Sequence, residues 1–122
     1  MIYYDAKRLV EEVQNLELTE REAYQLIGMG LSKRGKVRTL AAEEEGESFW
    51  EEHKCTIMKV FCEELEKSND VEQSLVDVVI FVLQVLKVTI HVVLGIIALL
   101  IRIGLQVVCE IYKEECRKGG VS

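Results

Sequence analysis

The stretch VDVVIFVLQVLKVTIHVVLGIIALLIRIGLQVV, residues 76–108, is a nearly unbroken apolar run that decides the fold class of this chain. When the run is set out at about 100° per residue, its polar side chains other than Thr89 cluster within an arc of roughly 80°. These clustered residues, which we call the polar seam, are Asp77, Gln84, Lys87, His91, Arg102 and Gln106. One narrow polar line on an apolar surface is typical of a helix that hides most of its circumference from water.

The helical pattern extends on both sides of the run, from about residue 71 to residue 118, with Gly95 and Gly104 as its weak points. The chain has no proline, which removes the strongest helix breaker. Residues 87–91 alternate between polar and apolar as a strand would, but the alternation fails on both sides. We therefore expect an all-α protein in which short N-terminal helices precede one long, mostly apolar helix, with two nearly collinear helices and a kink or break near Gly95 as the alternative.

Residues 1–70 form a charged helical region that precedes this apolar part, residues 71–118. Helices are expected over residues 3–16, from Thr19 to about residue 31, and over residues 41–67. Thr19 and Glu22 have the spacing of a capping box, in which each side chain accepts a backbone N–H of the other residue. Asp70 is placed to cap the helix that follows the Ser68-Asn69 break.

Length and charge limit the classes of function. A chain of 122 residues suits one domain, and its net charge of −6 argues against nucleic acid as a partner. The residues that follow Met1 lack the pattern of a signal peptide, so a reducing compartment with free thiols is expected. The sequence has no nucleophile elbow, phosphate loop or paired catalytic carboxylates, and we expect no enzymatic activity.

The four cysteines form two pairs with equal spacing, Cys55 with Cys62 and Cys109 with Cys116. Seven positions on a helix span about 10 Å, which is too long for a disulfide within either pair. The two helices could pair thiol to thiol if they packed side by side. We interpret the cysteines as small, partly buried apolar residues, with palmitoylation of Cys109 or Cys116 as an alternative. His53 and Cys55 point about 200° apart, so no metal site is expected there, and no cofactor.

The apolar run is long enough to cross a bilayer, which needs roughly 20 residues. Our first hypothesis is a small membrane-inserting, membrane-associated homo-oligomer whose seam lines an anion-favouring pore. The pore-lining residues would be Gln84, Lys87, His91, Arg102 and Gln106. The N-terminal helices would assemble copies or receive a protein partner. The basic residues Lys33, Arg34, Lys36 and Arg38 would contact lipid headgroups.

The second hypothesis is a soluble, cytoplasmic, all-helical interaction module, an adaptor or regulator that oligomerises through its apolar helix. In this interpretation the polar seam is the solvent-facing edge of a core helix. The apolar side chains on its other faces need cover from the N-terminal helices and from a second copy. A variant of this hypothesis folds the apolar part as a helical hairpin that breaks at Gly95 and is released into a membrane by a trigger.

Overall fold

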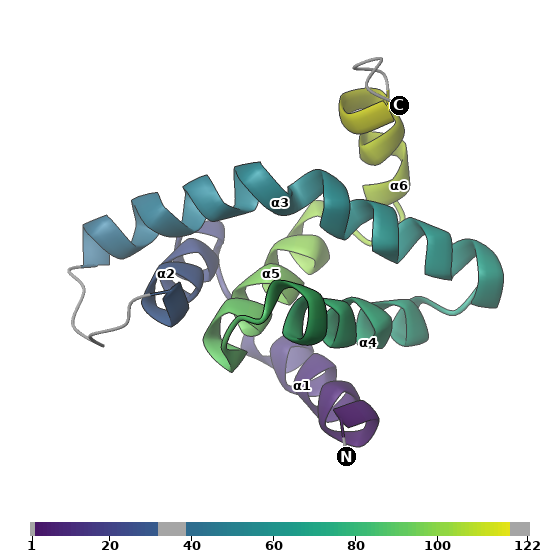
Figure 1. Ribbon diagram of the computed structural model, residues 1–122, viewed down its shortest axis with the longest axis horizontal. Helices are drawn as coiled ribbons and strands as arrows, with labels where there is room; N and C mark the ends of the chain where they lie inside the picture. The colour runs from purple at the N-terminus through teal and green to yellow at the C-terminus, as the bar shows by residue number, and fades with distance from the viewer. Residues whose placement is uncertain (1, 32–38, 118–122) are drawn as a thin grey trace.

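The computed structural model describes residues 2–31 and 39–117, and over these residues the chain is helical and contains no strand (Figure 1). The all-α class expected from the sequence is therefore confirmed. In chain order the elements are α1 (Ile2–Leu16), α2 (Glu20–Leu31), α3 (Thr39–Ser68), α4 (Val71–Phe81), the π-helical turn η1 (Val82–Leu86), α5 (Ile90–Ile103), α6 (Val108–Ile111) and the π-helical turn η2 (Tyr112–Arg117).

The junction between α1 and α2 is set by local hydrogen bonds that the sequence predicts. Glu17 ends α1 in the left-handed region, with φ of 49°. The Thr19 N–H then donates to Glu22 Oε1 at 2.9 Å, and the Glu22 N–H donates to Thr19 Oγ1 at 3.1 Å. The predicted capping box is confirmed, and the hydrogen bond from the Thr19 amide lowers the pKa of Glu22.

The junction between α3 and α4 is also set by a local hydrogen bond that the sequence predicts. Asn69 takes a left-handed φ of 55°, which asparagine tolerates better than most residues. Asp70 accepts the Gln73 N–H at 3.1 Å and caps α4, as predicted. We expected the N-terminal helices to be shorter than the apolar helix that follows them. Helix α3 has 30 residues, however, and is longer than any described helix that follows it.

The prediction of one continuous helix over residues 71–118 is wrong, because the apolar run is divided twice. The first division is η1 followed by Lys87, whose φ of 53° and ψ of 48° are left-handed. The second is the turn at Gly104, with φ of 102°, that separates α5 from α6. No break occurs at Gly95, which lies inside α5. Short pieces of helix can fold around one another, which a single rod cannot do.

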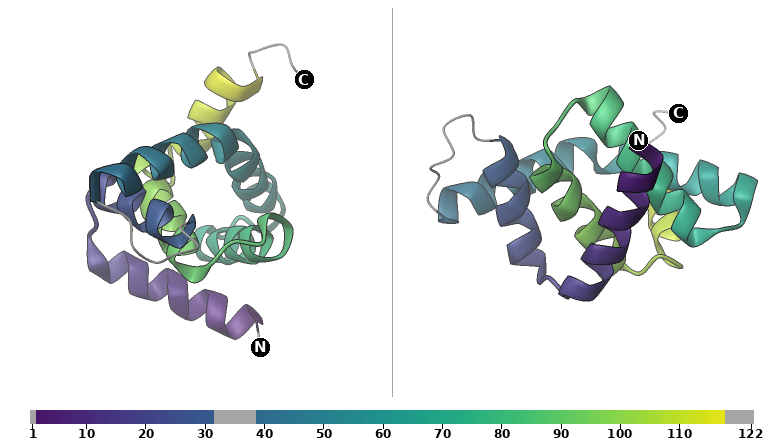
Figure 2. Two further views of the ribbon diagram at one scale, coloured as in Figure 1. Left: turned by 60° about the vertical axis from the view of Figure 1, so that its left-hand side comes forward. Right: turned by 90° about the horizontal axis from the view of Figure 1, so that it is seen from below.

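Helix α5 is the centre of the molecule, with α1, α2, α3 and α4 arranged around it (Figures 1 and 2). Eight of its 14 residues are buried: Val92, Val93, Gly95, Ile96, Ile97, Ala98, Leu99 and Leu100. Burial of each valine, isoleucine and leucine side chain among them contributes roughly 1.5–3 kcal/mol, and such burial is the main favourable contribution to folding. Most of the apolar surface of α5 is therefore covered within one copy of the chain.

Close helix packing around α2 depends on glycines of its neighbours. A Cβ atom on Gly46 of α3 would overlap the backbone carbonyl of Tyr24 in α2. A Cβ atom on Gly95 of α5 would lie 2.5 Å from the carbonyl oxygen of Ala23 on another side of α2. Contacts this short are closer than atomic radii allow, so α2 fits between α3 and α5 only because both positions lack a side chain.

Candidate functional site

The last described residues form a separate structural feature that we call the C-terminal arm, residues 108–117. The arm comprises α6 and η2, and it projects from the bundle past α3 (Figures 1 and 2). Two disulfides join it to α3: Cys62 with Cys109, and Cys55 with Cys116. The arm therefore runs antiparallel to α3, with covalent bonds two helical turns apart.

The prediction of free thiols is wrong, because all four cysteines are in disulfides. The arrangement that forms is the side-by-side pairing of the two helices, in which equal spacings of seven residues bring both pairs into register. That spacing was the one signal in the sequence for the pairing. What the sequence could not supply was the turn at Gly104, which directs the arm back along α3.

A groove of about 600 Å³ lies between α3 and the arm. This volume is within the range of ligand-binding clefts in proteins. The side chains that line it are Lys59, Cys62, Glu63, Leu65, Glu66 and Asn69 from α3 and the turn after it, and Cys109, Tyr112 and Lys113 from the arm. Leu65 and Tyr112 are partly buried against the core, and together with the Cys62–Cys109 disulfide they make the apolar part of the groove.

Charged side chains form the rim of the groove. Lys59, Glu63 and Glu66 on α3 are exposed, and so is Lys113 on the arm. None of the ion pairs found among the described residues involves any of these four side chains. An apolar floor with charges of both signs around it is typical of a polypeptide-binding surface, in which the floor supplies affinity and the rim supplies specificity.

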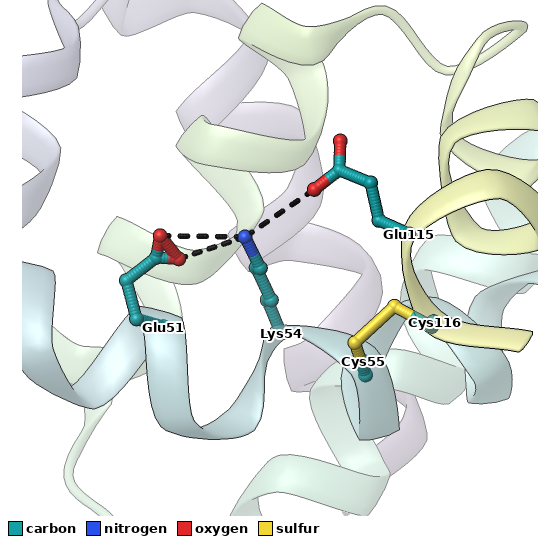
Figure 3. Close-up of a disulfide and its surroundings, with 5 residues drawn as sticks. All are labelled: Glu51, Lys54, Cys55, Glu115 and Cys116. Atoms are coloured by element: carbon teal, nitrogen blue, oxygen red, sulfur yellow. Dashed lines mark hydrogen bonds and ion pairs between the residues drawn. A yellow bond between two sulfur atoms is a disulfide. The ribbon is translucent and has the colours of Figure 1, made fainter. Parts of the chain in front are cut away.

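The far end of the arm is held by a second cluster, which Figure 3 shows beside the Cys55–Cys116 disulfide. Lys54 Nζ lies 2.7 Å from Glu51 Oε2 and 3.5 Å from Glu115 Oε1, so it links α3 to the arm. The hydrogen bond to Glu51 raises the pKa of Lys54, burial opposes that change, and Glu115 adds to it.

The residues of the polar seam are not brought together as one helical line. Asp77 lies in α4 and is partly buried. Gln84 lies in η1, Lys87 follows it, His91 is the second and Arg102 the last but one residue of α5, and Gln106 lies in the turn before α6; these five are exposed. Arg102 Nη1 donates a hydrogen bond of 3.5 Å to the Leu18 carbonyl, which ties α5 to the α1–α2 junction. The assignment of these residues to a pore lining stays a prediction.

Two further expectations concern membranes and metals. Lys33, Arg34, Lys36 and Arg38 lie outside the described residues, so their contact with lipid headgroups stays a prediction. Within residues 2–31 and 39–117, no single helix has both the length and the hydropathy to cross a bilayer. Ile90–Ile103 and Val108–Cys116 pass that test only together, and they are bent by 92°. The same residues contain no group of three or more His, Cys, Asp or Glu side chains placed to hold a metal ion.

Comparisons with protein-family models, with curated proteins and with solved structures found no match to this chain.

Proposed function

We propose that the chain is a small helical interaction module that binds a segment of a partner polypeptide in the groove between α3 and the C-terminal arm. The observation that carries this proposal is the composition of the groove. The groove has a volume of about 600 Å³, an apolar part made by Leu65, Tyr112 and the Cys62–Cys109 disulfide, and a rim whose four charged side chains make no ion pair among the described residues. A partner segment with a large apolar side chain between an acidic and a basic residue has the complementary chemistry.

The burial of α5 also favours an interaction module that acts through its surface. Eight of the 14 residues of α5 are buried within the same copy, so most of its apolar surface needs no second copy for shelter. This differs from the hypothesis in which the apolar helix is the oligomer contact, and it moves the proposed partner surface to the groove. Partner binding would then leave the core of the bundle unchanged, which is the usual behaviour of pre-organised complexes.

The experiment is a search for peptide ligands with the purified, oxidised full chain and a phage-displayed library of random peptides. Enriched peptides are synthesised, their affinities are measured by fluorescence anisotropy, and their contact sites are mapped by NMR chemical-shift changes. We expect the changes to centre on Lys59, Leu65, Tyr112 and Lys113. Peptides that bind elsewhere, or a library that yields no ligand above an unrelated helical protein, would contradict the proposal.

A pair of charge-reversal variants makes the test specific. Changing Lys59→Glu together with Lys113→Glu turns the rim wholly acidic, and we expect about tenfold or greater loss of affinity for an acidic-containing peptide. Arg8→Glu is the matched control, because Arg8 is exposed on α1, which contributes no residue to the groove. Equal affinities of the two variants for the peptide would mean that the rim does not take part in recognition.

Membrane insertion is the second candidate function, and one observation favours it. Ile90–Ile103 and Val108–Cys116 have together the length and hydropathy of a span. To insert, they would have to straighten, leave the bundle and lose the covalent connection of the arm to α3. Flotation of the reduced and the oxidised chain with vesicles of phosphatidylcholine and phosphatidylglycerol tests this: flotation of the reduced chain supports insertion, and no flotation of either form rejects it.

A further inference from the structure

The two disulfides of the arm have different surroundings. Cys62 is 9 % exposed and belongs to the hydrophobic core, and Cys109 packs against that core. Cys55 and Cys116 are both partly exposed and lie outside the core. Access of a thiolate to the sulfur atoms is one of the factors that set the rate of thiol–disulfide exchange. The Cys55–Cys116 bond is therefore the more open of the two to a reductant.

The arm itself is held differently along its length. Its first half has apolar anchors, because Val108 is fully buried and Ile111 packs against the core. Its second half begins with exposed residues, Lys113, Glu114 and Glu115. Among the described residues, the disulfide and the ion pair that join this half to α3 are Cys55–Cys116 and Lys54–Glu115. An ion pair this open to solvent is weak, so the disulfide is the principal restraint.

The groove depends on that restraint. Tyr112 and Lys113 are the groove residues that lie between Cys109 and Cys116, so they are held from both sides only while both disulfides are closed. When the outer bond opens, the last turn of the arm is attached by one end. Amides in a helix end with few apolar contacts exchange and fray readily. Tyr112 keeps its packing against the core, whereas Lys113, which follows it and lines the groove, loses its fixed position.

We propose that the Cys55–Cys116 disulfide is a redox-sensitive clasp, whose reduction by a dithiol loosens the end of the C-terminal arm and releases the peptide from the groove. The release of a peptide rests on the proposed function, whereas the opening of the arm does not depend on it. A thiolate of the dithiol attacks one of the two sulfur atoms, and the other leaves as a thiolate and takes up a proton. The second thiol of the reagent then displaces the protein sulfur and closes a cyclic disulfide. Two electrons pass to the protein, which ends with two thiols.

The test follows the two bonds separately in the full chain. The oxidised protein is titrated with dithiothreitol, trapped with iodoacetamide, and analysed by peptide mass spectrometry. Amide hydrogen exchange is measured on the same samples. We expect alkylation of Cys55 and Cys116 before Cys62 and Cys109, together with loss of amide protection over residues 112–117. Reduction of the inner pair first, of both pairs together, or full retention of protection after the outer pair opens would overturn the proposal.

Two variants separate the bond from its neighbouring ion pair. Cys55→Ser with Cys116→Ser reproduces the open clasp without a reductant, and it should show the same loss of protection and about tenfold weaker binding of the selected peptide. Lys54→Ala removes the ion pair and keeps the disulfide, and it should match the unchanged chain in both measurements. If Lys54→Ala alone frees the arm, the disulfide is not the restraint and the proposal is wrong.

The outcomes also distinguish the two proposals. If no peptide binds the groove, but the Cys55–Cys116 disulfide opens first and the arm loses amide protection, the redox-sensitive clasp is supported and the interaction function is contradicted. If peptides bind the groove with the same affinity in the oxidised chain and in the Cys55→Ser, Cys116→Ser variant, the interaction function is supported and the redox-sensitive clasp is contradicted.

Discussion

Single residues decide how closely the helices of this chain approach. Gly46 is the clearest case, because a Cβ atom there would occupy the space of the Tyr24 carbonyl. The overlap is with backbone rather than with the end of a flexible side chain, so relief requires movement of a whole helix. Periodicity in the sequence gives no warning of this, since a glycine in a helix usually only lowers helix propensity.

Gly46→Ala is therefore expected to lower the free energy of unfolding by about 1–3 kcal/mol, although alanine is the better helix former. Ser48→Ala is the matched control, because Ser48 is exposed on the same helix and the change improves helix propensity there. Urea denaturation of both variants with the disulfides intact provides the measurement. A stabilised Gly46→Ala variant would show that α2 and α3 are not in close contact at this position.

Because of Tyr24, we expect the free energy of unfolding to depend on pH in the alkaline range. Burial raises the pKa of its hydroxyl above the ordinary value of 10.0, and the carboxylates of Glu20, Glu47 and Glu51 raise it further. Above about pH 10 the unfolded chain releases this proton while the folded chain keeps it, so the free energy of unfolding falls as pH rises. We expect Tyr24→Phe to remove part of this fall. Urea denaturation between about pH 9 and pH 11 checks it, and identical pH profiles of the two proteins would contradict it.

Residue-scale features that depend on neighbours in sequence could be predicted, and those that depend on distant contacts could not. The capping box of Thr19 and Glu22 and the cap at Asp70 involve residues three positions apart, so spacing alone identifies them. The Cys55–Cys116 bond joins residues 61 positions apart. Its formation depends on the path of the chain between them, which residue spacing does not encode.

At the scale of elements, the main difference between sequence and structure is the division of the apolar run. The seam of polar residues every three, four or seven positions predicts one helix, and each piece of the run is indeed helical. Gly104 is a weak sequence signal for one division. At the other division Lys87 gives little signal, because lysine rarely takes the left-handed conformation that it has here. The short alternation over residues 87–91, which we interpreted as part of a helix, includes the connection between η1 and α5, residues 87–89, and the first two residues of α5.

Glycine substitutions within this connection and in the π-helical turn before it test the division. Lys87→Gly should raise the free energy of unfolding by up to about 1 kcal/mol, because it relieves the left-handed strain of a lysine. Gln84→Gly, at an exposed position inside η1, should lower it by about 1 kcal/mol. Thermal or urea denaturation measures both. One continuous helix would be destabilised by both changes, so a loss of stability in Lys87→Gly would contradict the division.

At the scale of the whole molecule, the bundle is held by its apolar core and by covalent bonds to the arm. The Cys62–Cys109 bond closes a segment with a sequence separation of 47 residues, and of its two cysteines Cys62 belongs to the core and Cys109 packs against it. Its loss in a Cys62→Ser, Cys109→Ser variant should lower the free energy of unfolding by about 2–5 kcal/mol. We expect a smaller loss for Cys55→Ser with Cys116→Ser, since those sulfur atoms lie outside the core. Equal losses would show that the two bonds are equivalent.

The fold class and the capping of α2 and α4 could thus be read from the sequence, whereas the groove could not. Three structural features form the groove together: the length of α3, the turn at Gly104, and the two disulfides that join α3 to the arm. Each is a consequence of tertiary packing. The residues expected to carry function were the polar ones of the apolar run, and the structure distributes them over the surface instead.

The apolar run is divided, and its middle piece, α5, is the buried core of a single copy. Residue-resolved amide hydrogen exchange of the oxidised chain in buffer without detergent measures this division and this burial together. We expect the slowest exchange over residues 92–100, with rapid exchange at residues 87–90 and 104–107. Uniform protection from residue 71 to residue 117, or exchange of the α5 amides as fast as that of exposed helix ends, would contradict it.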